Sequence, residues 1–202
     1  WGPLGVCVGA ILTQNTAWTN VTQALDRLRS AEALTAERLA DAPMESLETW
    51  LKPSGYFRVK AARVRHLARL WRDGGGLALF DGDLVSVRER VLSWPGVGPE
   101  TADCMLLYAG HRPVFVIDAY TRRIFQRHGW VESSDRYEAL RAQCEAQLHA
   151  APEGMTLTDY WGDYHAQLVA VGKDYCRPRR PHCEACPLRS LLPKGGPEIG
   201  EN

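Results

Sequence analysis

The chain has 202 residues, with 24 basic and 24 acidic side chains that leave no net formal charge. Its hydrophobic residues (45%) and charged residues (24%) occur in the proportions of an ordinary globular chain, which excludes general disorder. The length allows one domain or two small ones, and the balanced charge excludes a surface of one sign.

The first 25 residues carry no charge. Their apolar part, from Leu4 to Leu12, is shorter than the roughly 20 apolar residues that a membrane-spanning helix needs. The segment also lacks the basic start and the cleavage site of a secretory signal. We therefore expect a buried core helix here, in a cytoplasmic protein with no membrane partner.

Helices are predicted almost throughout the remaining chain. Apolar residues recur at helical intervals in segments bounded by capping residues, proline or glycine. The predicted segments are residues 16–28, 43–51, 58–72, 83–93 and 118–129, with others beginning at Pro99, Ser134 and Thr158. The longest strand-like alternation is residues 114–117, so the fold class is predicted to be all-α.

Two segments depart from the charge balance. Residues 51–72 hold seven basic side chains and no acid, and residues 173–194 hold six basic side chains against two acids. A run of this kind is often a solvated helix face. Two of them in a neutral chain favour contacts with phosphate groups.

The segment Trp-Pro-Gly-Val-Gly, residues 94–98, separates two predicted helices. Glycine adopts backbone conformations that other residues resist and lets a surface approach the chain. Pro99 begins the next helix, whose first amides would point outward and could bind an anion such as a DNA phosphate. A tight turn without a ligand is the alternative interpretation.

Asp118 follows Gly98 by twenty residues, and Arg122 and Arg123 come shortly after it. An aspartate at the start of a helix commonly caps the first backbone amides. The alternative is a functional carboxylate at the mouth of a cleft beside residues 94–98, the segment called the hairpin below.

Together these segments carry a family resemblance. Residues 92–102, followed by 116–123, resemble the helix-hairpin-helix DNA glycosylases, and the C-terminal cysteines resemble those of the endonuclease III family. Residues 11–16 and 55–57 resemble two DNA-contacting loops of that family, so the resemblance covers nearly the whole chain. The sequence around the hairpin and Asp118 also resembles a branch related to the bacterial 3-methyladenine DNA glycosylases.

The resemblance implies two α-helical lobes that bind double-stranded DNA across a cleft. Residues 17–129 would form one lobe with the helix-hairpin-helix motif. Residues 1–16 and 130–202 would form a second, discontinuous lobe with a cysteine-cluster loop. The protein would act as a monomer at the nucleoid on DNA containing a damaged base, which it turns out of the duplex because the glycosidic bond is inaccessible in the stack.

The resemblance also implies roles for individual residues. Asp118 matches the catalytic aspartate, whose carboxylate stabilises the positive charge that develops on the sugar. Gln14 matches a residue that fills the gap left by the flipped base, and Tyr56 matches a wedge that could stack on the partner base. Either residue could instead belong to the core. The hairpin residues expected to contact DNA are Gly96, Gly98 and Thr101.

Glu100 marks a departure from the family pattern. Members that also cut the strand have a lysine at this position, two residues after the last hairpin glycine, which forms a Schiff base with the sugar. A carboxylate cannot form an imine. Among the four lysines, Lys60 is the one that folding could bring near the position of Glu100. We therefore expect hydrolysis of the glycosidic bond with little or no lyase activity.

The expected substrate is an alkylated base. Trp18 and Tyr120 could stack on a cationic purine, and Glu100 would favour its charge, although each aromatic ring could equally be a core residue. Oxidised or deaminated pyrimidines are the second expectation. The alternative from another class is a non-catalytic or very weakly active binder of damaged or structured DNA.

Cys176, Cys183 and Cys186 lie within eleven residues, a spacing that indicates a metal site rather than a disulfide framework. Through the resemblance they are expected to hold an iron–sulfur cluster, most simply [4Fe-4S]. The fourth family cysteine is replaced by Leu192, so a ligand other than that cysteine is expected. The candidates for it are Cys7, Cys144 and His182. Zinc held by the three cysteines and either His165 or His182 is the alternative.

Overall fold

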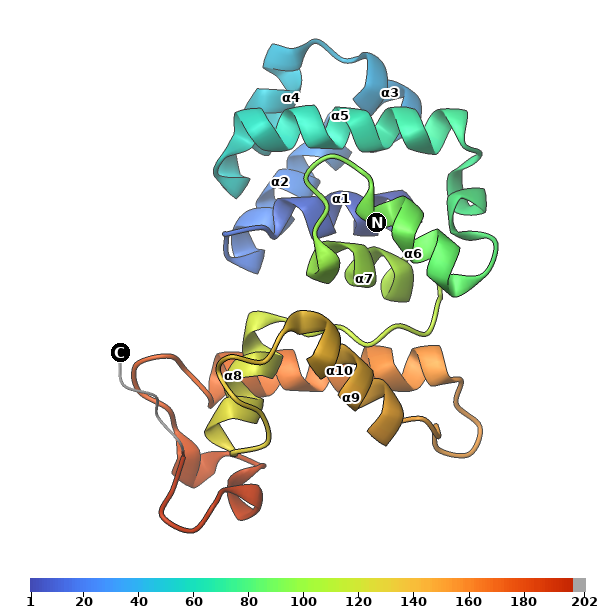
Figure 1. The fold of residues 1–202 in the computed structure, drawn as a ribbon. Helices are drawn as coiled ribbons and strands as arrows, with labels where there is room; N and C mark the ends of the chain where they lie inside the picture. Colours follow the sequence, from blue (N-terminus) through green and yellow to red (C-terminus); the bar gives the residue numbers. More distant parts are fainter. Residues whose placement is uncertain (198–202) are drawn as a thin grey trace. The chain divides into compact units, whose positions relative to one another are not determined.

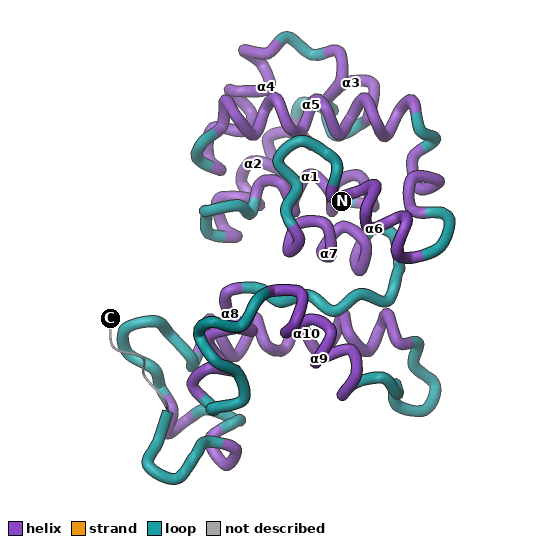
Figure 2. The backbone as a smooth tube through the Cα atoms, in the orientation of Figure 1, coloured by secondary structure: helices purple, strands orange, loops and turns teal. Residues whose placement is uncertain are grey.

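The computed structural model describes residues 1–197. These residues form helices joined by loops and no strand, which confirms the all-α prediction (Figure 2). The chain divides into two compact units, Trp1–Arg112 and Pro113–Asn202. No helix of the described residues is both long enough and apolar enough to cross a membrane.

The first unit is built around the long helix α5, shown in teal in Figure 1. This helix packs against α1, α3 and α4, and α1 packs in turn against α2 and α7. The unit's helices are α1 (Gly2–Leu12), α2 (Trp18–Ser30), α3 (Ala36–Asp41), α4 (Met44–Leu51), α5 (Phe57–Asp73), α6 (Leu84–Leu92) and α7 (Pro99–Tyr108), with the 3-10 helices η1 (Lys52–Ser54) and η2 (Gly76–Phe80).

The helices on either side of residues 94–98 are joined by a buried ion pair. Arg88 of α6 donates two hydrogen bonds to the carboxylate of Asp103 in α7, at 2.7 and 3.1 Å. The Asp103 side chain is fully buried, and that of Arg88 is 13% exposed. Paired, two-pronged contacts of this kind fix geometry as well as energy. The ion pair therefore helps to hold α6 and α7 together on either side of residues 94–98.

The second unit consists of α8 (Ala119–Arg127), α9 (Tyr137–Gln147) and α10 (Leu157–Asp174), with the 3-10 helices η3 (Cys183–Ala185) and η4 (Arg189–Leu191). Helices α8 and α10 pack against each other. Arg123 of α8 strengthens this contact by donating to the carbonyls of Gly172 and Cys176 near the end of α10. Between α10 and residue 197 the chain is mostly loop (Figure 2).

The two units do not coincide with the lobes predicted from the sequence. The prediction joined residues 1–16 to the C-terminal part, whereas α1 lies in the first unit because Val8, Ile11 and Leu12 are buried in its core. Residues 113–129 were predicted to belong with the hairpin. They lie in the second unit because α8 packs on α10.

The predicted helices begin within three residues of the observed ones, but the short helix α3 was not predicted. Asp83 and Asp118 cap α6 and α8 through their side chains. The remaining differences arise where several polar residues are adjacent and the hydrophobic pattern does not distinguish them. The N-caps of α2, α9 and α10 are Ala17, Arg136 and Thr156 rather than Thr16, Ser134 and Thr158.

Candidate functional site

Gln14 connects the end of α1 to the hairpin. Its side-chain Nε2 donates to the carbonyl of Gly96 at 2.9 Å and to Oγ1 of Thr101 at 3.1 Å. Its Oε1 accepts a short hydrogen bond from Arg63 of α5. Three residues expected to contact DNA, Gln14, Gly96 and Thr101, are thus brought together, although more than 80 positions separate Gln14 from the hairpin.

Gly96 has a structural reason to be glycine. Its φ is +76°, a conformation that costs other residues about 1–2 kcal/mol. A Cβ at this position would lie 2.0 Å from Nε of Arg63. The Arg63 side chain therefore reaches Gln14 only because Gly96 leaves room for it.

We expect Gly96→Ala to lower the free energy of unfolding by about 2 kcal/mol or more, because it adds backbone strain and displaces Arg63. Urea denaturation measures this. Gly98→Ala is the matched control, since Gly98 has φ −95° and nothing within 4 Å of an added Cβ. Its loss should be about 1 kcal/mol or less. Equal losses in the two variants would contradict this account of Gly96.

Gly98 is the N-cap of α7, and Pro99 occupies the first turn. Glycine has no side chain that could cap the first amides of the helix, and both residues are exposed. Backbone amides at such a helix start can donate hydrogen bonds to an external anion. This is the arrangement expected from the sequence.

Tyr56 is the most exposed of the large hydrophobic residues in the described chain, at 73%. It is the N-cap of α5 and adopts a left-handed backbone conformation, with φ 45° and ψ 32°. A tyrosine in this region is strained and is held there by its surroundings. The core interpretation of Tyr56 does not fit, because its ring lies in solvent.

Lys60 is buried, with 2% of its surface exposed. Its Nζ donates to the carbonyl of Leu12 at 2.9 Å and to that of Ser54 at 2.6 Å. Burial, and to a smaller extent the charge of Arg63, lower the pKa of this amine. The sequence marked Lys60 as a possible amine near the site but did not indicate that it is buried.

Asp118 caps α8 in the second unit. One carboxylate oxygen, Oδ1, accepts from the backbone amide of Thr121 at 2.7 Å. The other, Oδ2, lies 3.7 Å from Nε2 of His165 on α10, and the two side chains are 12% and 9% exposed. The capping interpretation is therefore correct, and a second oxygen remains beside an imidazole.

The environment of Asp118 keeps its carboxylate ionised. Burial raises the pKa, but the neighbouring His165 and Thr121 lower it by more, so the net pKa lies below its ordinary value. Because the pKa of Asp118 is lower in the folded protein, its ionised carboxylate stabilises the fold at pH values above the pKa of the unfolded chain. This stabilisation is lost as the pH falls through the pKa of the folded protein. At neutral and mildly acidic pH the group is negatively charged.

The three predicted pocket residues have different surroundings. Glu100 is exposed in the first turn of α7. Trp18, in the first unit, is 48% exposed and meets the ring of Trp1 edge-on at 6.2 Å. Tyr120, in the second unit, lies against Gly172 with the Arg123 guanidinium 5.2 Å from its ring centre.

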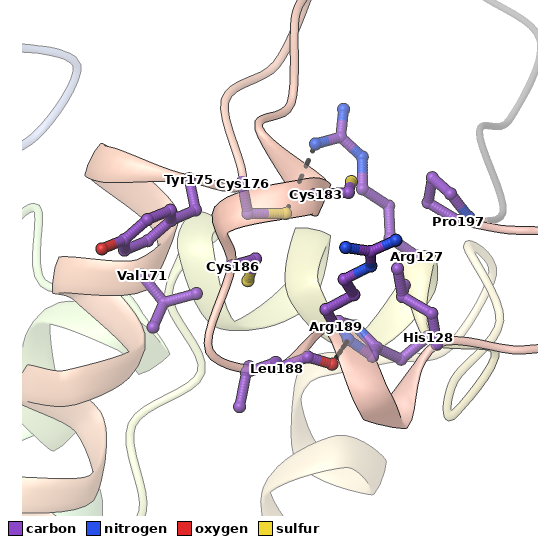
Figure 3. A pocket seen from close by; sticks show the side chains of 11 residues that line it. Arg127, His128, Val171, Tyr175, Cys176, Cys183, Cys186, Leu188, Arg189 and Pro197 are labelled. Atoms are coloured by element: carbon purple, nitrogen blue, oxygen red, sulfur yellow. Dashed lines mark hydrogen bonds between the residues drawn. The ribbon is translucent and has the colours of Figure 1, made fainter.

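The three clustered cysteines line one pocket (Figure 3). The space between them measures about 310 Å³, part of which is open to solvent. Leu192, at the position of the fourth family cysteine, lines the same pocket. Arg127 donates to Sγ of Cys176 at 3.3 Å.

The residues that line this pocket meet some of the requirements of a group bound by thiolates. Three soft sulfur donors face one pocket, and a neighbouring arginine can stabilise thiolate charge. The candidate fourth ligands do not line it. Cys7 is buried in the first unit, and burial raises the pKa of its thiol to about 12. Burial, and to a smaller extent the charge of Glu145, raise the pKa of the Cys144 thiol to about 11. His182 is exposed outside the pocket, and His165 lies beside Asp118.

Among residues 1–197, no three His, Cys, Asp or Glu side chains lie close enough together to hold a single metal ion. His128 does line the cysteine pocket. Its ring nitrogens lie 2.7 Å from the carbonyl of Ile124 and 3.3 Å from that of Leu188. The ring is thereby oriented by the backbone.

Comparisons with known proteins identify the fold. Residues 8–149 match the sequence model of the HhH-GPD superfamily, described as base excision DNA repair proteins. MJ1434 of Methanocaldococcus jannaschii, whose name assigns it provisionally to the DNA repair glycosylases, is 35% identical over 92% of this chain and 83% of its own. Endonuclease III of Thermotoga maritima is 31% identical over 93% of this chain and 81% of its own.

Solved structures agree at the level of the fold. A non-covalent complex of endonuclease III with DNA gives a TM-score of 0.76 at 22% identity, covering 96% of this chain and 85% of that one. The 3-methyladenine DNA glycosylase MagIII of H. pylori, bound to 1,N6-ethenoadenine, gives 0.67 at 24% identity, covering 84% of each chain.

The chain belongs to the HhH-GPD superfamily of base excision DNA repair proteins. Within it, the chain is a DNA glycosylase similar to endonuclease III, as the resemblance of the hairpin, Asp118 and the cysteines implied.

Proposed function

We propose that this glycosylase hydrolyses the bond between a damaged base and deoxyribose with Asp118 as the catalytic carboxylate. The observation that carries the proposal is a carboxylate only 12% exposed, with one oxygen accepting from the Thr121 amide and the other beside His165. Rupture of the bond sends its electron pair to the base and leaves positive charge on the sugar. The carboxylate stabilises that charge and orients a water, whose oxygen bonds to the sugar carbon while the water gives up a proton to the carboxylate.

The residues of the first unit would open the duplex. Gln14 would occupy the space of the flipped base, and the exposed ring of Tyr56 would stack on its partner. The amides at Gly98 would hold the DNA backbone. Because the substrate would be chromosomal DNA, we place this action at the nucleoid, with the enzyme as a monomer.

The reaction would stop at the abasic site. Glu100 occupies the position of the Schiff-base lysine, and the Lys60 amine is buried with two carbonyl acceptors. An amine held in this way cannot attack a sugar.

Borohydride trapping tests this part of the proposal, because it converts a Schiff base into a stable protein–DNA adduct. With an abasic duplex we expect no adduct above that of a protein known to lack lyase activity. Glu100→Lys restores the amine and is the matched positive variant. A strong adduct with the unchanged protein would mean that another amine reacts.

An alkylated purine is the proposed substrate. Glu100 is exposed and acidic at the hairpin, and Trp18 offers a half-exposed ring, both suited to a cationic base. The fold is shared with MagIII, whose ligand is an alkylated adenine derivative. The second candidate is a damaged pyrimidine, since the chain is also similar in sequence to endonuclease III.

A panel of duplexes distinguishes these candidates. Each duplex would carry 3-methyladenine, hypoxanthine, uracil, thymine glycol or mismatched thymine, and free base would be measured by chromatography. Release of 3-methyladenine would support the first candidate, and release of a pyrimidine the second. If no duplex of the panel released free base while tight binding was retained, a non-catalytic binder of damaged DNA would be favoured.

We also propose an iron–sulfur cluster at Cys176, Cys183 and Cys186, most simply [4Fe-4S] with a fourth ligand that is not cysteine. Such a cluster would tie the loop after α10 to α8 and supply structure rather than catalysis. The pocket shared by the three thiols supports this proposal. Zinc, the alternative from the sequence, fits less well, because among residues 1–197 no three candidate ligand side chains lie close enough together to hold one ion.

Cys183→Ser should reduce bound iron and sulfide by at least about half and lower the melting temperature by several degrees, because metal binding stabilises the fold that holds it. Iron and sulfide analysis and calorimetry measure both. Cys104→Ser, on α7 in the first unit, is the control and should retain the metal. A colourless protein with stoichiometric zinc would contradict the iron assignment.

A further inference from the structure

Lys60 joins two chain segments that the proposed function assigns to the opened duplex. Its ammonium donates to the carbonyls of Leu12 and Ser54 at 2.9 and 2.6 Å. Leu12 ends α1 two residues before Gln14, and Ser54 ends η1 two residues before Tyr56. One buried group therefore holds both segments just upstream of Gln14 and Tyr56.

We propose that Lys60 is a positioning residue that sets the spacing between Gln14 and Tyr56 before DNA binds. The inference rests on the proposed function, in which these two side chains enter the space of the flipped nucleotide. Lys60 itself touches no DNA.

The chemistry of the site favours this role over simple core filling. Burial disfavours an ammonium group, and an apolar side chain of similar length would fill the same space without that penalty. Leu12 is the last residue of α1, where helix carbonyls lack intrahelical partners and the helix dipole is negative. An ammonium satisfies such a carbonyl and can bond a second one from another segment at the same time.

Arg63 reinforces the arrangement from the next turn of α5. It donates to Oε1 of Gln14, whose Nε2 is held by Gly96 and Thr101. The Gln14 segment is thus fixed through its backbone by Lys60 and through its side chain by Arg63. Fixing a binding segment in advance reduces the ordering cost of association.

The test compares the affinity of the full chain for undamaged duplex and for a duplex with a tetrahydrofuran abasic analogue. Lys60→Met removes the donors and keeps the length of the side chain. Arg65→Met is the matched control, because Arg65 lies on the same helix and also donates to a carbonyl, that of Ala42 at the end of α3. Thermal melting shows that each variant is folded.

We expect Lys60→Met to lose at least about tenfold of the preference for the abasic analogue while its affinity for undamaged duplex changes less than about threefold. Arg65→Met should keep the preference. If Lys60→Met does not fold, Lys60→Gln retains one amide donor and should lose part of the preference.

A double-mutant cycle separates positioning from general stabilisation. In a Gln14→Ala, Tyr56→Ala background, Lys60→Met should change the preference by less than about twofold, because the residues it positions are absent. A loss of equal size in that background, or a folded Lys60→Met protein with full preference, would overturn the inference. A wild-type protein without any preference would instead contradict the proposed function.

Discussion

Asp118→Asn is expected to reduce the rate of base release by about 10²–10³-fold or more, because asparagine cannot supply the negative charge that stabilises the cationic sugar. The fold should survive, since asparagine caps helices about as well as aspartate and can still accept from the Thr121 amide. DNA binding should therefore be retained. Single-turnover kinetics with free base as the readout measure the effect.

Asp83→Asn provides the matched control for this substitution. Asp83 caps α6 in the same way, with its carboxylate accepting from the Ser86 amide at 3.0 Å. The same change at this cap should leave base release within about twofold of the unchanged protein. Equal losses in the two variants would mean that Asp118 acts only through the helix cap.

Asp103→Ala is expected to lower the free energy of unfolding by about 3–5 kcal/mol, because it leaves the partly buried Arg88 without its carboxylate. This loss is a large fraction of the stability of a typical domain. Urea denaturation measures it, and the hairpin between α6 and α7 should also lose its fixed geometry.

An exposed ion pair of the same unit gives the control. Asp41 pairs with Arg72 at 3.2 Å, and their side chains are 71% and 35% exposed. Asp41→Ala should cost no more than about 1 kcal/mol. The double variant Arg88→Met, Asp103→Leu should recover most of the loss, since it removes both charges from the interior. Failure to recover would show that the ion pair is not the source of the effect.

Features with a local sequence signal were predictable. The hairpin glycines, the aspartate caps and the run of helices follow from residue types a few positions apart. The contact of Gln14 with Gly96 and Thr101 joins residues more than 80 positions apart and has no local signal. The same holds for the approach of His165 to Asp118, which depends on the packing of α8 against α10.

The basic segment 51–72 shows why charge counts were less informative. Its side chains were interpreted as a solvated face or as phosphate contacts. Several of them instead bind carbonyl, amide or carboxylate groups of the protein itself, because α5 packs against α1, α3 and α4. Lys60 donates to the carbonyls of Leu12 and Ser54, and Arg63 donates to the side chain of Gln14. Arg65 donates to the carbonyl of Ala42, Arg72 pairs with Asp41 and Asp73, and Arg58 pairs with Glu48.

The division into units was also beyond the sequence pattern. Hydrophobic spacing predicts which face of α1 is buried but not which helices cover it. Resemblance to a family supplies the order of motifs, whereas the grouping of helices depends on contacts made after folding.

The most direct test of a monofunctional glycosylase is a strand-cleavage assay on the substrate that the duplex panel identifies. Wild-type protein and Asp118→Asn would be assayed in parallel, with each reaction divided and one half treated with alkali. We predict cleavage by the wild-type protein only after alkali, and none above background by the variant in either half. Cleavage without alkali, or undiminished activity in Asp118→Asn, would contradict the proposed mechanism.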